Sequence, residues 1–248
     1  MMSYKILLIT TGGTIAQTHD EHGIAISGAS NGLEDTINQI IELLNNHDQE
    51  LHQISSVDIK SIMNKDSSNI IPEDWVDIIN VIVKEYDNYD AFVVTHGTNT
   101  LGYTCAALSF ALGNLGKPVV LTGSQVSYGY PSSDARMNME SAFRIAAYKE
   151  EKIAGVMAVF GSNIITGTRV KKTTEFDFDA FKAFNTANTI GRIGNSIRIN
   201  SESLAQHMSF LKPMAHRASE LKINNDFDMH IVSLTEFPGM SSSIFQSL

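Results

Sequence analysis

Short apolar runs recur along the first two thirds of the chain, and one more follows near residue 230. None of the earlier runs shows the strict polar alternation of a half-exposed strand. Uninterrupted apolar runs of this length are typical of strands that are buried on both faces of a parallel sheet. We therefore predict strands at Tyr4–Thr10, Ala91–Thr95, Val119–Thr122, Gly155–Phe160 and His230–Leu234.

Between these runs, apolar residues return at the three- and four-residue spacing of an amphipathic helix. The clearest helix begins near Pro72, whose fixed backbone suits a first helical position. Glu73 and Asp74 follow it, where acidic side chains interact favourably with the helix dipole. The same spacing predicts three further helices. One starts at Glu34, and the other two cover Leu101–Leu115 and Ala135–Ala146.

This order of strands and helices predicts an α/β fold with an open, mostly parallel sheet flanked by helices. Sheets of this kind carry their ligand sites in the loops at the carboxyl ends of the strands. The polar, glycine-containing stretch from Gln17 to Gly32 predicts a loop. From Arg169 to Asp226 the regular alternation fades, and the pattern predicts loops with short elements.

Composition narrows the class of protein. The length of 248 residues allows one large domain, or one domain and a remnant. The chain has 27 acidic and 18 basic side chains, which give a net charge of −9. That balance lacks the basic surface that nucleic-acid binding requires. A single cysteine, Cys105, excludes an internal disulfide, and no run is long enough for a membrane span. The run Ile6–Ile9 is too short for a signal peptide, so we expect a cytoplasmic protein.

Small polar clusters follow three of the predicted strands: Thr10–Thr14, Thr95–Thr100 and Thr122–Gln125. Glycines there allow close backbone approach, hydroxyls supply nucleophiles or hydrogen bonds, and helix-start N–H groups suit an anion. One such cluster alone is usually a capped turn. Three clusters at equivalent strand ends favour a site for an amide or a carboxylate.

Other site types fit less well. The G-x-G-x-x-G pattern of a dinucleotide site is missing, and no amphipathic helix follows the first strand. His19 and His22 lie in a polar stretch without the further ligands of a tetrahedral metal site, so a solvated loop is favoured over a metal site. The S-x-x-K match at Ser219–Lys222 lacks its companion motifs and is attributed to chance. We expect no metal and no cofactor.

Several segments in the right order carry a resemblance to a known family. The segments Thr11–Ala16 (TGGTIA) and His96–Thr100 (HGTNT) resemble the two signatures of the bacterial-type L-asparaginases. The resemblance runs from Tyr4 to about Asn185, and within the family this stretch is most similar to the cytosolic type I branch. Further matching segments are Asp66–Ser68, Pro72–Trp75, Leu108–Phe110, Asn114–Pro118, Thr122–Gln125, Ser133–Asp134, Arg169 and Lys172.

The resemblance implies an amidohydrolase that splits asparagine to aspartate and ammonia through a threonine nucleophile and an acyl-enzyme. It places the nucleophile at Thr14, and the second catalytic threonine and its activating lysine at Thr98 and Lys172. These roles agree with chemistry, because a threonine hydroxyl needs a neighbouring base and a desolvated lysine can serve as one. Substrate contacts are implied at Asp66, Ser67, Asn99 and the backbone of Gly97.

Two departures from the family lie within the expected site. Asn99 occupies the position of an aspartate that binds the α-ammonium of the substrate, and an amide supplies no negative charge. The lid tyrosine of the family is missing from the stretch Glu21–Gly28, and Tyr103 and Tyr128 lie elsewhere in the pattern. We therefore expect impaired activity toward asparagine.

Other functions stay open at this stage. One is a non-catalytic protein of the same fold that binds an amino acid or serves in an assembly. Another is an amidase for an amide that lacks a free α-ammonium, for which Asn99 is the better partner. A transamidase subunit that acts on charged tRNA shares the motifs, but the acidic charge balance disfavours it.

The family comparison also predicts the domain organisation. We expect an N-terminal catalytic domain over residues 1–190, a linker over 191–227, and the opening of a C-terminal α/β domain over 228–248. Active sites of the family lie between subunits, which implies a homo-oligomer, a dimer or a tetramer, acting on a small amino-acid amide. The strand predicted at His230–Leu234 would be exposed without its own sheet and would favour self-association.

Overall fold

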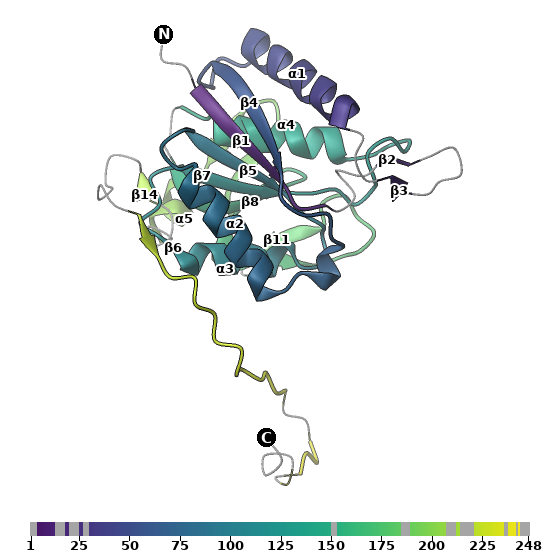
Figure 1. Ribbon diagram of the computed structural model, residues 1–248, viewed down its shortest axis with the longest axis vertical. Helices are drawn as coiled ribbons and strands as arrows, with labels where there is room; N and C mark the ends of the chain where they lie inside the picture. The colour runs from purple at the N-terminus through teal and green to yellow at the C-terminus, as the bar shows by residue number, and fades with distance from the viewer. Residues whose placement is uncertain are drawn as a thin grey trace.

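A computed structural model describes residues 4–12, 18–19, 25–26, 30–149, 153–184, 189–206, 212–213, 221–235, 238–241 and 243. Nine of the described strands form one sheet, in the order β13-β12-β9-β8-β7-β5-β1-β4, and β14 pairs with β8 beside this path (Figure 1). The five strands from β8 to β4 run parallel, and the others are antiparallel to their neighbours. Their bounds are β1 (Tyr4–Thr10), β4 (Ile54–Ser61), β5 (Ala91–Thr95), β7 (Pro118–Thr122), β8 (Ile153–Phe160), β9 (Asn163–Thr166), β12 (Thr189–Ile193), β13 (Ile197–Ile199) and β14 (Lys212–Pro213).

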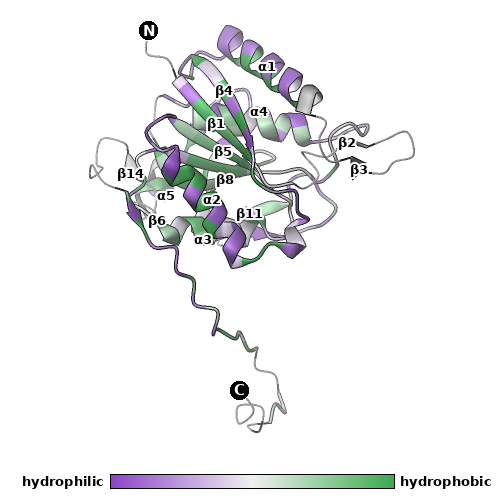
Figure 2. Ribbon diagram, in the orientation of Figure 1, coloured by the Kyte–Doolittle hydropathy of each residue, from purple (hydrophilic) through white to green (hydrophobic). Residues whose placement is uncertain are grey.

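Helices cover both faces of this sheet, α1 and α4 on one face and α2 and α3 on the other (Figure 1). Successive side chains of β1 point to opposite faces of the sheet. Ile6 and Leu8 pack toward α1 and α4, whereas Leu7 and Ile9 pack toward α2 and α3. Figure 2 accordingly shows hydrophobic residues along the sheet and hydrophilic ones on the outer side of α1. The helices are α1 (Ser30–His47), α2 (Pro72–Lys84), α3 (Leu101–Ala111), α4 (Ala135–Ala146) and the short α5 (Ser201–Gln206).

The predicted fold class and most predicted elements are confirmed. The strand Ala91–Thr95 and the helix Ala135–Ala146 begin and end where the pattern placed them. The helix that starts at Leu101 ends at Ala111, because Leu112–Gly113 forms the short strand β6, which pairs with β15 (Lys222–Ile223). Two strands of the main sheet before Arg169, β4 and β9, were missed. β4 lies at the edge of the sheet and alternates irregularly between buried and exposed positions, and β9 is only four residues long and follows β8 closely.

The loop predicted over Gln17–Gly32 contains more structure than expected. Two short strands, β2 (Thr18–His19) and β3 (Ala25–Ile26), pair antiparallel there, and α1 already begins at Ser30. The stretch after Arg169 holds short elements, as predicted, including β10 (Val170–Lys172) and β11 (Phe181–Ala183). In addition, β12 and β13 of this stretch extend the main sheet.

The prediction of a strand at His230–Leu234 is wrong. After β15 the chain runs away from the body of the molecule, as the tail at the bottom of Figure 1 shows, and it pairs with no strand of the described part. A strand needs a partner for its backbone hydrogen bonds, and none of the described strands lies beside this segment. Ile231 and Val232 are therefore 76% and 64% exposed. Among the described helices, none is long and apolar enough to cross a membrane.

Candidate active site

Four loops meet at the carboxyl edge of the parallel strands β4, β1, β5 and β7. The ends of three neighbouring strands are in register, since Thr10 pairs with Thr95 and Thr95 with Thr122. Backbone hydrogen bonds join the loops beyond them: Thr11 N–H donates to Thr95 O, and Lys65 N–H donates to Thr11 O at 3.0 Å. Each of the three polar clusters found in the sequence therefore begins at this one edge.

Close packing between the loops depends on two glycines. Gly12 has φ of +101°, and a Cβ at this position would lie 2.6 Å from the backbone nitrogen of Lys65. A Cβ on Gly97 would lie 2.7 Å from Ser67 Oγ. Only a residue without a side chain permits these approaches, so the glycines bring the loops after β1 and β5 against the loop after β4.

The loop after β4 contacts the loop after β5 through Ser67 and Ser68. Asp66 caps the 3₁₀ helix η1 (Ser67–Asn69) by accepting the Ser68 N–H at 2.8 Å. Ser67 is 3% exposed, and its Oγ accepts the backbone N–H of Asn99 at 3.2 Å. The Asn99 side-chain amide donates to Ser68 Oγ at 2.8 Å. Three of the predicted substrate-binding residues, Asp66, Ser67 and Asn99, thus belong to one hydrogen-bonded group, with Gly97 packed against Ser67.

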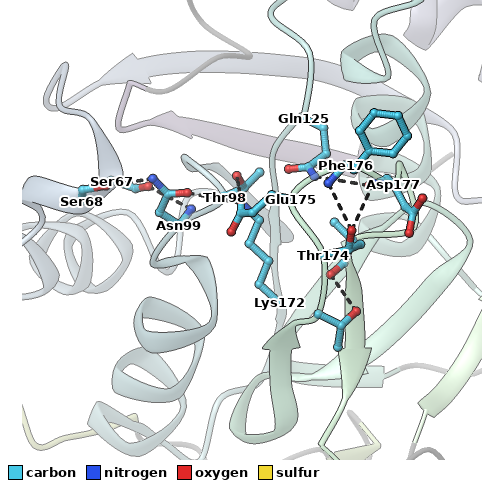
Figure 3. A network of polar contacts seen from close by, with 12 residues as sticks. Ser67, Ser68, Thr98, Asn99, Gln125, Lys172, Thr174, Glu175, Phe176 and Asp177 are labelled. Atoms are coloured by element: carbon cyan, nitrogen blue, oxygen red, sulfur yellow. Dashed lines mark hydrogen bonds and ion pairs between the residues drawn. The ribbon is translucent and has the colours of Figure 1, made fainter.

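Lys172 reaches this group from β10, which packs against α3. Its Nζ donates to Thr98 Oγ1 at 2.9 Å and to Asn99 Oδ1 at 3.3 Å, and it forms an ion pair with Glu175. Figure 3 shows these side chains converging on the lysine nitrogen. Only 12% of the Lys172 side chain is exposed. The structure therefore brings Lys172 to Thr98 and Asn99, which lie 74 and 73 residues before it in the sequence, and adds Glu175, which was not predicted.

A buried carboxylate holds the loop after β7. Asp134 is 3% exposed and accepts the backbone N–H groups of Gln125 and Val126 at 3.0 Å. It also accepts the side-chain amide of Asn138, which donates in addition to the carbonyl of Gly123 at 2.9 Å. The sequence indicates Asp134 only through the matching segment Ser133–Asp134, and Asn138 carries no signal because it is one polar residue within the predicted helix Ala135–Ala146.

His96 supports the turn that carries Thr98, a role that the sequence did not indicate. Its Nδ1 lies 2.7 Å from the carbonyl oxygen of Gly97, and its Nε2 lies 2.9 Å from Thr104 Oγ1, which also accepts the indole N–H of Trp75. A carbonyl oxygen can only accept, so the Nδ1–H donates to Gly97, and in the neutral ring Nε2 then accepts the Thr104 hydroxyl. Burial of the ring lowers the pKa of His96, which favours this neutral form.

The neutral state of His96 gives a testable pH dependence. Because the pKa is lower in the folded chain than the ordinary value of 6.5, the unfolded chain binds the extra proton first as the pH falls. We expect this contribution to the free energy of unfolding to be complete above pH 6.5 and to decrease below it, by up to about 1.4 kcal/mol per pH unit. Denaturant unfolding of wild type and His96→Asn between pH 7.5 and 5 measures it. Equal slopes in the two proteins would contradict the assignment.

Some predicted residues lie outside the described part of the chain. Thr14 is one of them, together with Gly13, His22 and the Ser219–Lys222 segment except for its last two residues. His19 is described only as part of β2. Across the ranges that the structure does describe, no group of three or more His, Cys, Asp and Glu side chains is placed to hold a metal ion.

Comparisons with known proteins agree with this geometry. A family model described as "Asparaginase, N-terminal" matches residues 5–205. The chain belongs to the asparaginase family. It is 32% identical over 244 residues to the L-asparaginase of Thermococcus kodakarensis, covering 98% of this chain and 67% of the relative. It is also 32% identical over 248 residues to L-asparaginase 1 of Escherichia coli K12, covering 100% of this chain and 68% of that protein.

Solved structures of asparaginases share the fold. The crystal structure of L-asparaginase I from Vibrio cholerae superposes with a TM-score of 0.80 at 29% identity, covering 99% of this chain and 68% of that one. A second group of relatives has another name: a glutamyl-tRNA(Gln) amidotransferase subunit of Pyrococcus abyssi is 34% identical over 254 residues, which cover 98% of this chain and 53% of that protein. The chain is thus an asparaginase-like amidohydrolase, and its similarity to type I asparaginases is confirmed.

Proposed function

We propose that this asparaginase-family chain hydrolyses the side-chain amide of L-asparagine to L-aspartate and ammonia. The observation that carries the proposal is the contact between Lys172 Nζ and Thr98 Oγ1, at 2.9 Å and largely shielded from water. A hydroxyl and an amine in this contact form a proton-transfer pair. The pair lies at the loop after β5, next to the strand β1 that precedes Thr14 in the sequence.

In the proposed reaction, the Lys172 ammonium that pairs with Glu175 in the free site first loses a proton to water. The Thr14 hydroxyl then attacks the amide carbon, and its proton passes through Thr98 to the lysine amine. The tetrahedral intermediate carries an oxyanion, for which backbone N–H groups near Gly97 are suitable donors. The Thr98–Lys172 pair returns its proton to the amide nitrogen, ammonia leaves, and an ester between Thr14 and the acyl group remains. Water then hydrolyses this ester and regenerates the threonine.

We further propose that the two ends of the amino acid bind at the group formed by Asp66, Ser67 and Asn99. A carboxylate can accept the α-ammonium, and hydroxyl and backbone N–H groups can donate to the α-carboxylate. Asn99 itself carries no charge, and its amide already donates to Ser68. Position 99 alone therefore binds a free ammonium less tightly than an aspartate would.

The neutral side chain of Asn99 supports a second candidate function. An amidase whose substrate has a blocked or missing α-ammonium needs no carboxylate at this position. A third candidate, a binding protein without turnover, shares the same site residues. The amidotransferase relatives suggest work on a charged tRNA as a further candidate, but a net charge of −9 opposes nucleic-acid binding.

Location and assembly are also proposals. We propose a cytoplasmic homo-oligomer, a dimer or a tetramer, and the single buried cysteine is consistent with a reducing compartment. We also propose an N-terminal catalytic domain followed by a linker and the opening of a second domain. Because β12 and β13 extend the main sheet, we place the end of the first domain near residue 206 rather than 190.

Ammonia release tests the proposed function. Purified protein is incubated with L-asparagine, L-glutamine and an N-acylated asparagine, beside a Thr14→Ala control. We expect release from L-asparagine well above the control. Release from the N-acylated amide alone would favour the second candidate, and calorimetric binding of L-aspartate without any release would favour a binding protein.

A further inference from the structure

One charged side chain in the candidate site has no counterpart in the residues predicted from the sequence. Glu175 lies in the turn between β10 and β11, three residues after Lys172, and forms an ion pair with the lysine nitrogen. Its side chain is 79% exposed, whereas that of Lys172 is 12% exposed. The exposed carboxylate of Glu175 therefore contacts a largely buried ammonium; Figure 3 shows Glu175 beside Lys172 and Thr98.

The turn holds Glu175 in this place. Thr173 N–H donates to the Ala180 carbonyl at 2.8 Å and closes the hairpin. Thr174 Oγ1 accepts the backbone N–H groups of Phe176 and Asp177, at 3.1 and 3.4 Å, and so tightens the backbone on both sides of Glu175. These bonds hold the backbone of Glu175 beside Lys172, and the exposed side chain stays free to turn.

The charges around the lysine explain why a carboxylate is needed there. An amino-acid ligand brings an α-ammonium to the group around Asn99, whose Oδ1 lies 3.3 Å from Lys172 Nζ. Two ammonium groups this close repel one another unless a negative charge lies between or beside them. Asn99 supplies no such charge, because its side chain is an amide.

We propose that Glu175 supplies the negative charge that the asparaginase resemblance assigns to position 99. Without a ligand, the carboxylate neutralises Lys172. When an amino acid binds, the exposed Glu175 side chain turns toward the α-ammonium and offsets its repulsion by the lysine. Glu175 is then the residue that selects ligands with a free α-ammonium. The inference rests on the proposed function for the identity of the ligand class.

None of the other acidic side chains described in this region forms an ion pair with Lys172. Asp66, which the proposed function places at the amino-acid ends, accepts the Ser68 N–H through Oδ1, and Asp179 accepts the side-chain amide of Asn163 at 2.6 Å, so neither offsets the charge of Lys172 directly. Asp177 lies on the far side of the turn from Thr98 in Figure 3, where its backbone carbonyl accepts from Gln125. Among the described residues, Glu175 is the carboxylate in direct contact with Lys172.

A charge-relocation experiment tests this inference. Calorimetry measures the binding of L-aspartate and of N-acetyl-L-aspartate to wild type, Glu175→Gln and the double variant Glu175→Gln/Asn99→Asp. We expect Glu175→Gln to weaken L-aspartate binding about fivefold, the size expected for a partly exposed ion pair, and to leave N-acetyl-L-aspartate unchanged. The double variant moves the carboxylate to position 99 and should restore L-aspartate binding. Asp177→Asn removes the same charge from the same turn and should change neither ligand.

The outcomes separate this inference from the proposed reaction. Unchanged L-aspartate binding in Glu175→Gln, an equal loss for both ligands, or a double variant no better than the single one would overturn the role of Glu175, even if wild type releases ammonia. Failure of wild type to bind L-aspartate would overturn it as well. If the expected binding pattern is found and wild type releases no ammonia, the selection by Glu175 stands and the proposed hydrolysis fails.

Discussion

Replacement of Lys172 by methionine is expected to lower the rate of ammonia release from L-asparagine by about 10²- to 10⁴-fold, the usual contribution of a positioned acid–base group. Methionine preserves most of the apolar stem and removes the nitrogen that contacts Thr98 at 2.9 Å. Without it, Thr98 has no amine to receive a proton, and the nucleophile is not activated. Steady-state kinetics measures the effect, which should fall mainly on kcat.

The adjacent lysine provides a matched control. Lys171 is exposed and lies over the ring of Phe184, with its nitrogen 5.6 Å from the ring centroid, on the opposite side of β10 from the site. Lys171→Met should therefore change the rate by less than about threefold, since surface substitutions have small effects. A similar loss in both variants, or none in Lys172→Met, would contradict the role of the Thr98–Lys172 pair.

Replacement of Asp134 by alanine is expected to cause the largest loss of stability, about 3–5 kcal/mol. The carboxylate accepts the backbone N–H groups of Gln125 and Val126 and the side-chain amide of Asn138. Alanine leaves these donors buried without an acceptor, and each unsatisfied group costs about 1–3 kcal/mol. Denaturant unfolding followed by circular dichroism measures the change.

The same substitution at an exposed aspartate controls for the change in side chain. Asp177→Ala should alter the free energy of unfolding by less than about 0.5 kcal/mol. If Asp134→Ala were as mild as this control, the loop after β7 would not depend on the buried carboxylate. Because that loop borders the candidate site, a fall in ligand affinity should accompany the fall in stability.

The elements of the sheet were predictable where burial alone determines them. β5 is buried at every position and α4 presents one continuous apolar stripe, so their patterns are unambiguous. The edge strand β4 alternates irregularly because only part of it contacts the core. His230–Leu234 has the composition of a strand, but a strand forms only where a neighbouring strand pairs with its backbone. The composition of a segment does not show whether such a neighbour is present.

The candidate site was predictable in part, and for a different reason. Thr98, Asn99 and Lys172 were linked by family resemblance and not by spacing, since 73 or 74 residues separate the lysine from the other two. Glu175 and His96 were not assigned, because their roles arise from side-chain contacts at one end of the sheet. An exposed glutamate and a histidine at the end of a buried strand have many ordinary explanations in a sequence.

The way the four loops are assembled has a consequence for folding. Thr11 and Thr95, which bond across β1 and β5, are 84 residues apart in the chain, and parallel pairing over such distances requires large loops to close before any contact forms. The chain should therefore fold slowly, and the ligand-binding group should appear only with the last of these pairings. A ligand that contacts several of the loops binds only the finished sheet. The free energy of unfolding of the whole domain should therefore increase with the logarithm of the ligand concentration, once that concentration exceeds the Kd.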